Sequence, residues 1–154
     1  MFLCEILSLY SKPALISAEF SVHADKVTTM NTYNLVPILI DFHALSPCII
    51  GSGILTKDGL VLESVLPVEQ EEDIIAGCGA ALSAVARNAA RQILQGKMGA
   101  VLVKSDNGFV IVSPCEGELI LAVIVTTDAV LNEILQAVER TVRVIGQTVF
   151  DLAA

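Results

Sequence analysis

The alternation of apolar and polar positions after residue 34 predicts a chain of helices and antiparallel strands. Apolar residues recur at helical spacing over 35–44, over 73–95 and again after 128. Between these segments lie shorter runs that alternate or stay apolar and that end at Gly, Asn or Asp, as strands do. The expected strands are 49–56, 60–64, 100–105, 109–113 and 119–126.

Short turns determine how these strands pair. Asp58-Gly59 predicts a two-residue hairpin turn, in which both central positions need positive φ. The connections at 106–108 and 115–117 are so short that they permit only antiparallel pairing. The segment 119–125, LILAVIV, is apolar at every position and is expected to be a central strand with both faces covered. The order α-β-β-α-β-β-β-α therefore predicts an α/β (α+β) fold, a five-stranded antiparallel sheet sandwiched by helices.

The long helix at 73–95 combines an apolar face with an unusual density of small residues. Its apolar face is formed by Ile74, Cys78, Leu82, Val85, Ala89 and Ile93. Cys78 on this face is expected to be a small core residue. Small residues on the other faces let backbones come close, so we expect the sheet on one side and the same helix of a second copy on another. Gly51 and Gly53 are expected to let a helix approach the sheet.

Composition excludes several classes of partner. The chain is 54% apolar and 17% charged, and its net charge is −8. An acidic chain without a basic stripe disfavours nucleic acid and anionic membrane surfaces, because phosphate groups would repel it. No apolar run is long enough for a membrane span. The four cysteines have no metal-binding spacing, and we expect a cytoplasmic protein without disulfides.

No pattern of catalytic or cofactor-binding residues is present. The acidic run Glu71-Glu72-Asp73 is interpreted as a solvated helix start, where negative charge complements the helix dipole. His23 and His43 have no Cys, Asp or His at ligand spacing, so neither a metal nor a cofactor is expected. The sequence has no GxxxxGK[ST] motif and is not expected to bind GTP through a P-loop.

Four stretches together resemble the roadblock/LC7 family, whose fold is profilin-like. They are IIGSGILTKDGLVLES, IIAGCGAALSAVARNAARQIL, MGAVLVKSDNGFVIVSPCEGELILAVIV and TTDAVLNEILQAVERTV. The resemblance covers about residues 34–146, and Cys48 departs from it because many relatives have Gly after Pro. We expect an N-terminal extension at 1–29, the roadblock/LC7 domain at 30–150 and a tail at 151–154.

The resemblance implies a homodimer in which the long helices pack together and the third strands pair. The implied interface residues are Gly77, Ala80, Ala81, Ala84, Arg87, Asn88, Arg91, Ala100, Val101, Leu102 and Val103. Arg87, Arg91, Gln95 and Lys97 are weaker candidates for contact with another partner.

The function implied is that of a non-enzymatic module that binds and regulates a small Ras-like GTPase in signalling, closest to the bacterial and archaeal members of the family. It would act as a GTPase-activating or scaffold protein. One alternative is a dimeric adaptor, like a dynein light chain, with no effect on nucleotide state. Another is a sensor of a small ligand.

Overall fold

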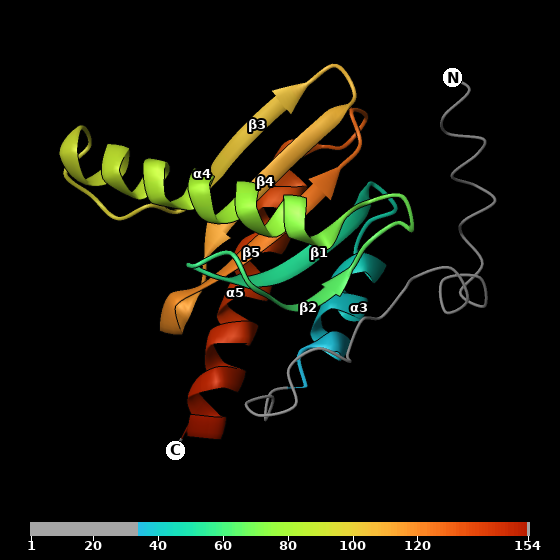
Figure 1. Ribbon diagram of the computed structural model, residues 1–154. Coiled ribbons are helices and arrows are strands. Elements are labelled where there is room, and N and C mark those ends of the chain that lie inside the picture. The colour runs from blue at the N-terminus through green and yellow to red at the C-terminus, as the bar shows by residue number, and fades with distance from the viewer. Residues whose placement is uncertain (1–33, 154) are drawn as a thin grey trace.

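The computed structural model describes residues 34–153, so the extension at 1–29, with His23 and Cys4, lies outside the described residues. Figure 1 shows the arrangement of the elements. In chain order they are α3 (Val36–Ala44), β1 (Ile49–Thr56), β2 (Val61–Val65), α4 (Glu72–Gln92), β3 (Val101–Ser105), β4 (Gly108–Pro114), the 3₁₀ turn η1 (Glu116–Glu118), β5 (Leu119–Val125) and α5 (Leu131–Ala153). The predicted order of helices and strands is confirmed. The last helix begins at Leu131 and continues through residues 151–153, which were expected to form a tail.

The sheet has the strand order β2-β1-β5-β4-β3, and every neighbouring pair is antiparallel. The apolar segment LILAVIV is β5, the central strand, as predicted. Its residue Leu121 lies between Ile54 of β1 and Ser113 of β4. Every residue of β5 except Ile124 is buried, because helices cover both faces of the sheet.

The helices form two layers around the sheet, with α4 on one face and α3 and α5 on the other (Figure 1). The larger core lies under α3 and α5 and contains Phe42, Ile54, Val123 and Ile145. The smaller core lies under α4, where Leu55, Val112 and Ile120 meet Ala76 of the helix. Because successive side chains of a strand point to opposite faces of the sheet, Ile54 of β1 lies in one core and Leu55 in the other.

The β1–β2 turn differs from the expected two-residue turn. Lys57, Asp58 and Gly59 form a three-residue loop, closed by hydrogen bonds from the Thr56 amide to the Leu60 carbonyl (2.8 Å) and from the Gly59 amide to the Thr56 carbonyl (3.0 Å). Only Gly59 has positive φ, at 84°. This is the turn type in which one left-handed residue follows the turn, so Gly is required at one position and Asp58 keeps an ordinary backbone.

All the residues that α4 buries against the sheet are small. The buried residues of this helix are Ala76, Gly79, Ser83 and Ala90, which we call the sheet side. A Cβ atom on Gly79 would lie 2.7 Å from Cδ1 of Leu55, so the helix backbone approaches β1 directly at this position. The expected close approach at Gly51 and Gly53 is wrong, because the atoms nearest to both belong to strand residues and to Leu66 and Pro67.

The apolar face read from the sequence is therefore not the face buried against the sheet. Cys78 was expected in the core, and it is exposed. Ile74 and Val85, on the same face, are 59% and 70% exposed. The sequence pattern misled because apolar residues usually mark the core side of a helix, whereas close packing on this sheet requires the smallest side chains.

Two glycine substitutions test the close approach of α4 to the sheet. Gly79→Ala should lower the free energy of unfolding by about 1–3 kcal/mol, because the added methyl group collides with buried Leu55. Gly77→Ala is the matched control. No atom lies within 4 Å of a Cβ built there, so it should gain up to about 1 kcal/mol of helix propensity. Denaturant unfolding measures both, and equal effects would contradict the packing described here.

Candidate interaction surface

Two exposed sides of α4 differ in composition and face opposite edges of the sheet. Because a helix turns once in 3.6 residues, spacings of three and four define each side. The β3 side is formed by Cys78, Leu82, Val85 and Ala89. The turn side, facing the β1–β2 turn, is formed by Gly77, Ala80, Ala84, Arg87 and Arg91.

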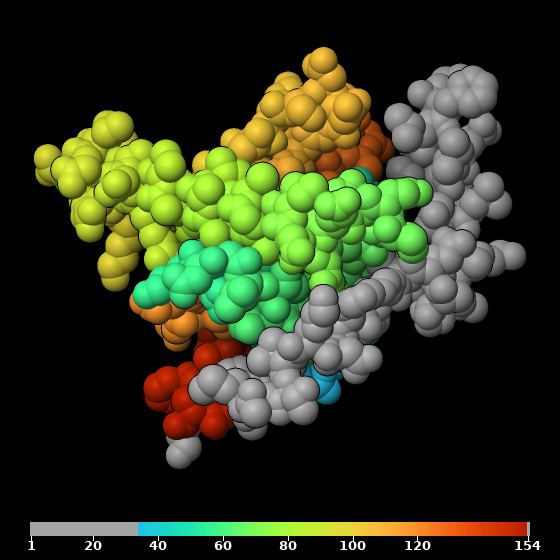
Figure 2. All heavy atoms as spheres, in the orientation of Figure 1, coloured from blue at the N-terminus to red at the C-terminus, as the bar shows by residue number. Residues whose placement is uncertain are grey.

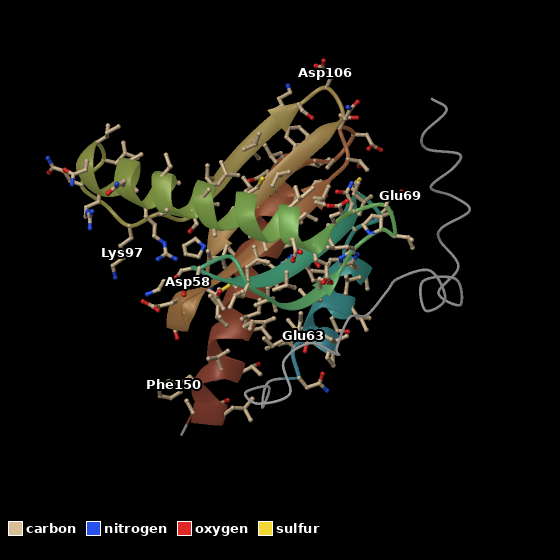
Figure 3. All side chains as sticks on the ribbon, viewed as in Figure 1. Asp58, Glu63, Glu69, Lys97, Asp106 and Phe150 are labelled. Carbon is tan, nitrogen blue, oxygen red and sulfur yellow. The ribbon has the colours of Figure 1, made fainter. Side chains whose placement is uncertain are left out.

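Packing contacts show which part of the molecule each of these two sides of α4 faces. Leu82 packs on the smaller core together with Val101 of β3. On the turn side, a Cβ atom on Gly59 would lie 3.7 Å from both the Cα of Gly77 and the Cβ of Ala80. Figure 3 shows the same division, with Asp106 of the β3–β4 turn above α4 and Asp58 of the β1–β2 turn below it.

The exposed part of α4 carries no charge along most of its length. From Ile74 to Ala89 the exposed residues are Ile74, Gly77, Cys78, Ala81, Ala84, Val85, Asn88 and Ala89. Solvent-facing helix surfaces normally carry charged residues. Figure 2 shows that α4 runs across the whole of this face of the molecule and projects beyond the strands at its C-terminal end. An uncharged, projecting helix surface indicates a contact site for another protein.

A groove continues this surface toward β3. It has a volume of about 370 Å³ and lies between the C-terminal half of α4 and the connection to β3. Its lining residues are Leu82, Val85, Ala86, Ala89, Ala90, Leu94, Lys97, Met98, Gly99, Ala100 and Val101. Lys97 is the only charged residue among them. The groove therefore extends the apolar β3 side of α4 down to the sheet edge.

The strand β3 forms an edge of the sheet and pairs only with β4 among the described strands. Val103 on this strand is 41% exposed. An edge strand presents a row of backbone N–H and C=O groups that a further strand can pair with. The β3 side of α4, the groove and the edge of β3 thus form one continuous surface.

The residues expected at a dimer interface are divided by the fold. Val101, Leu102 and Val103 lie on the edge strand β3, and Ala100 lines the groove. Gly77, Ala80, Ala84, Arg87 and Arg91 lie on the turn side, away from that edge, while Ala81 and Asn88 lie on the outermost part of the helix. Val85 and Leu82 lie beside the same edge and were not among the expected interface residues. The apolar repeat contained the signal, but it was read as a core face.

The candidate partner contacts are also divided. Arg87 and Arg91 share the turn side, and Arg91 donates a hydrogen bond of 2.8 Å to the side-chain oxygen of Asn88. Gln95 has a positive φ of 53° in the loop that follows α4. Lys97 lines the groove. The fold therefore brings two of these four residues together.

Near the turn side, Lys57 forms an ion pair of 2.6 Å with Glu118. The hydrogen bond and the charge of Glu118 raise the pKa of Lys57, while Arg87 acts in the opposite direction.

The titratable residues inside the fold are separate from this surface. His43 of α3 and Ser52 of β1 form a hydrogen bond of 2.9 Å between Nε2 and Oγ, on the α3 face of the sheet. Burial lowers the pKa of His43 from 6.5 to about 4. Burial also raises the pKa of the Cys115 thiol to about 12. Glu72, at the start of α4, accepts a hydrogen bond from the Ser64 hydroxyl.

The described residues hold free thiols but no metal centre or membrane-spanning helix. Within 34–153 no group of His, Cys, Asp and Glu side chains could hold a metal ion. Cys48, Cys78 and Cys115 are free thiols. None of the helices in this range combines the length and apolar character that crossing a bilayer demands.

Comparison with known proteins agrees with this fold. The family model of the roadblock/LC7 domain matches residues 39–125, more than half of the 154-residue chain. The chain belongs to the roadblock/LC7 family. No curated protein sequence matches it. Roadblock/LC7 proteins are generally non-enzymatic.

Solved structures show the same fold at low sequence identity. A roadblock/LC7 domain from Streptomyces avermitilis is 19% identical, with a TM-score of 0.71, over 77% of this chain and 99% of that one. MglB of Myxococcus xanthus is 13% identical, with a TM-score of 0.69, over 80% and 95%. LokiProfilin1, solved in complex with rabbit actin, is 16% identical, with a TM-score of 0.51, over 73% and 94%.

Burial of His43 leads to a pH dependence of stability. The fold favours the neutral imidazole, so between pH 6.5 and about 4 the unfolded chain binds a proton that the folded chain does not. The free energy of unfolding should therefore fall as the pH falls through this window. Denaturant unfolding at several pH values should show this slope in the wild type and a weaker one in His43→Gln. An unchanged slope in the variant would contradict the assignment.

Proposed function

We propose that this chain is a non-enzymatic homodimeric module that binds and regulates a small Ras-like GTPase in the cytoplasm. The observation that carries the proposal is the uncharged exposed surface of α4, continuous with the open edge of β3. Membership of the roadblock/LC7 family supports the regulation of a GTPase, because that is the role that the resemblance implies.

A second copy of this chain fits the surface formed by the β3 side of α4, the groove and the edge of β3. In a two-fold symmetric dimer the same patch of each copy meets itself, so an apolar helix side can cover its own counterpart. Burying Val85 and Ile74 would remove exposed apolar area from water, which is the main driving force of association. Pairing of the two β3 edges would satisfy the open backbone groups and make one sheet through both copies.

The β3 side replaces the small-residue stripe as our expected helix contact. Gly77, Ala80 and Ala84 lie toward the β1–β2 turn of the same chain, so a second copy placed against them would sit away from the β3 edge. A contact through Leu82, Val85 and Ala89 lets helix and strand meet the second copy at once.

Two neighbouring residues of α4 distinguish these arrangements. Val85→Arg should convert the dimer to a monomer, because it places a charge in the centre of the apolar contact. Ala84→Arg introduces the same charge one residue earlier, on the turn side, and should leave the dimer intact. Light scattering after size exclusion measures the mass. Dissociation by Ala84→Arg alone would contradict the proposed interface.

Binding and regulation of a small GTPase can be measured directly. Small Ras-like GTPases encoded beside this chain should be retained by the immobilised protein, and its addition should change their rate of GTP hydrolysis or nucleotide exchange by about tenfold or more. Absence of binding to all of them would refute regulation.

Two other outcomes would favour the alternatives. Binding with unchanged hydrolysis and exchange rates would indicate an adaptor that bridges larger assemblies. A rise in melting temperature with a small apolar ligand, abolished by Val85→Arg, would indicate a sensor that uses the groove, because a ligand bound to the folded state stabilises it.

A further inference from the structure

The sheet has a second open edge at β2. Among the described strands β2 pairs only with β1, and it lies at the opposite end of the sheet from β3. Its outward backbone N–H and C=O groups can therefore pair with a further strand. Val61 and Leu62 of β2 are only half-buried, although Val61 packs on the smaller core and Leu62 on the larger one. A strand placed beside β2 would cover these side chains further.

The chain before α3 is attached to the domain near this edge. On the face of the sheet that carries two helices, α3 packs on β2 and β1, whereas α5 packs on β4. Figure 1 shows α3 beside β2, at the end of the sheet away from β3. Leu35, directly before α3, is fully buried in the larger core together with Val65 of β2. The 33 residues that precede Asn34 are therefore joined to the domain at the β2 end of the sheet.

One stretch of these 33 residues has the pattern of a strand. Residues 16–24, ISAEFSVHA, alternate apolar and polar residues at all nine positions. Strict alternation of this length is typical of a strand with one face covered. The stretch contains no Gly or Pro, and Pro13 lies outside it. Its sequence therefore predicts an amphipathic strand, which needs both a neighbouring strand and an apolar surface to cover it.

The length of the connection allows this stretch to reach β2. The ten residues 25–34 join it to α3. Ten extended residues span up to about 35 Å, whereas a strand with the five residues of β2 is about 17 Å long. Because the stretch belongs to the same chain, its effective concentration at β2 is on the order of millimolar, which favours it over a strand of a separate protein.

We propose that residues 16–24 form a sixth strand that pairs with the open edge of β2. Its apolar side, with Phe20 at the centre, would face the α3 side of the sheet, where Leu62 and Val65 of β2 pack on the larger core. The other face of β2 is polar at this end, because the Ser64 hydroxyl donates a hydrogen bond to Glu72 of α4. The polar side of the stretch fits that face.

This pairing would limit how copies of the chain assemble. β2 and β3 are the two edges of the sheet. If both edges were open, copies could add at either end and form open-ended assemblies. A chain that covers its own β2 leaves only β3 for a second copy, so assembly stops at the dimer of the proposed function. The pairing itself does not require that dimer.

Hydrogen exchange in the full-length chain, followed by NMR, tests the pairing. In the wild type the amides of 16–24 should exchange at least about tenfold more slowly than those of a synthetic peptide with the same sequence. Successive N–H groups of a strand point to opposite edges, so Phe20→Pro with Ser21→Pro removes a donor to β2 in any register. This double variant should speed exchange at 61–65 by about tenfold or more.

The matched control places the same two prolines in the connection. Thr28→Pro with Thr29→Pro should leave exchange at 61–65 unchanged. The amides of the central strand β5 should stay protected in both variants, which shows that the domain remains folded. If the first variant loses this protection too, the comparison of the wild type with the peptide decides.

Two neighbouring residues test which side of the stretch is covered. Phe20→Glu should lower the melting temperature by about 3 °C or more, because it places a charge against the larger core. Ser21→Glu adds the same charge on the opposite, polar side and should have little effect. Equal shifts in the two variants would contradict an amphipathic strand at this edge.

Three further results would overturn the inference. One is exchange of 16–24 at the rate of the free peptide. Another is equal exchange at 61–65 in the two proline variants. A fall in mass in the Phe20→Pro, Ser21→Pro variant, measured by light scattering, would show that the stretch pairs with β2 of another copy. Binding of a GTPase enters none of these measurements, so the inference and the proposed function fail separately.

Discussion

The close packing of α4 on the sheet is the constraint on which the other surfaces depend. Gly79 brings the helix backbone against Leu55 of β1, and Ala76 meets the same small core. Since interiors pack as densely as organic crystals, a helix this close has room only for small side chains beneath it. Of the larger apolar residues of α4, Ile75 and Leu82 pack at the margin of this core, while Ile74 and Val85 are exposed.

The exposure of Ile74 and Val85 gives the domain its character as an interaction module. A globular helix ordinarily buries its large apolar residues against its own core, but α4 keeps Val85 exposed beside the edge strand β3. On the opposite side, the β1–β2 turn is fixed to Glu118 and rests on the helix at Gly59. One helix thus separates the apolar groove beside β3 from the side that packs against the β1–β2 turn.

Surface residues, and not the fold alone, decide which partner this chain binds. The chain shares its fold with MglB and with a profilin solved in complex with actin, at identities of 13% and 16%. A common fold at this distance does not specify a partner, because partners are recognised by side chains on the surface. On the other face of the sheet, the partly buried His43–Ser52 pair makes stability depend on pH, while the groove beside α4 is lined by other residues.

Local periodicity and turn length were enough to predict the order of the elements, the antiparallel sheet and the central place of LILAVIV. The sequence also identified the roadblock/LC7 family. The side of α4 that is buried could not be predicted in this way. It depends on the distance between the helix and the sheet, which leaves room for Gly79 beneath the helix and keeps Val85 exposed. The ion pair between Lys57 and Glu118 likewise required the fold, because the two residues lie 61 positions apart and no local pattern links their turns.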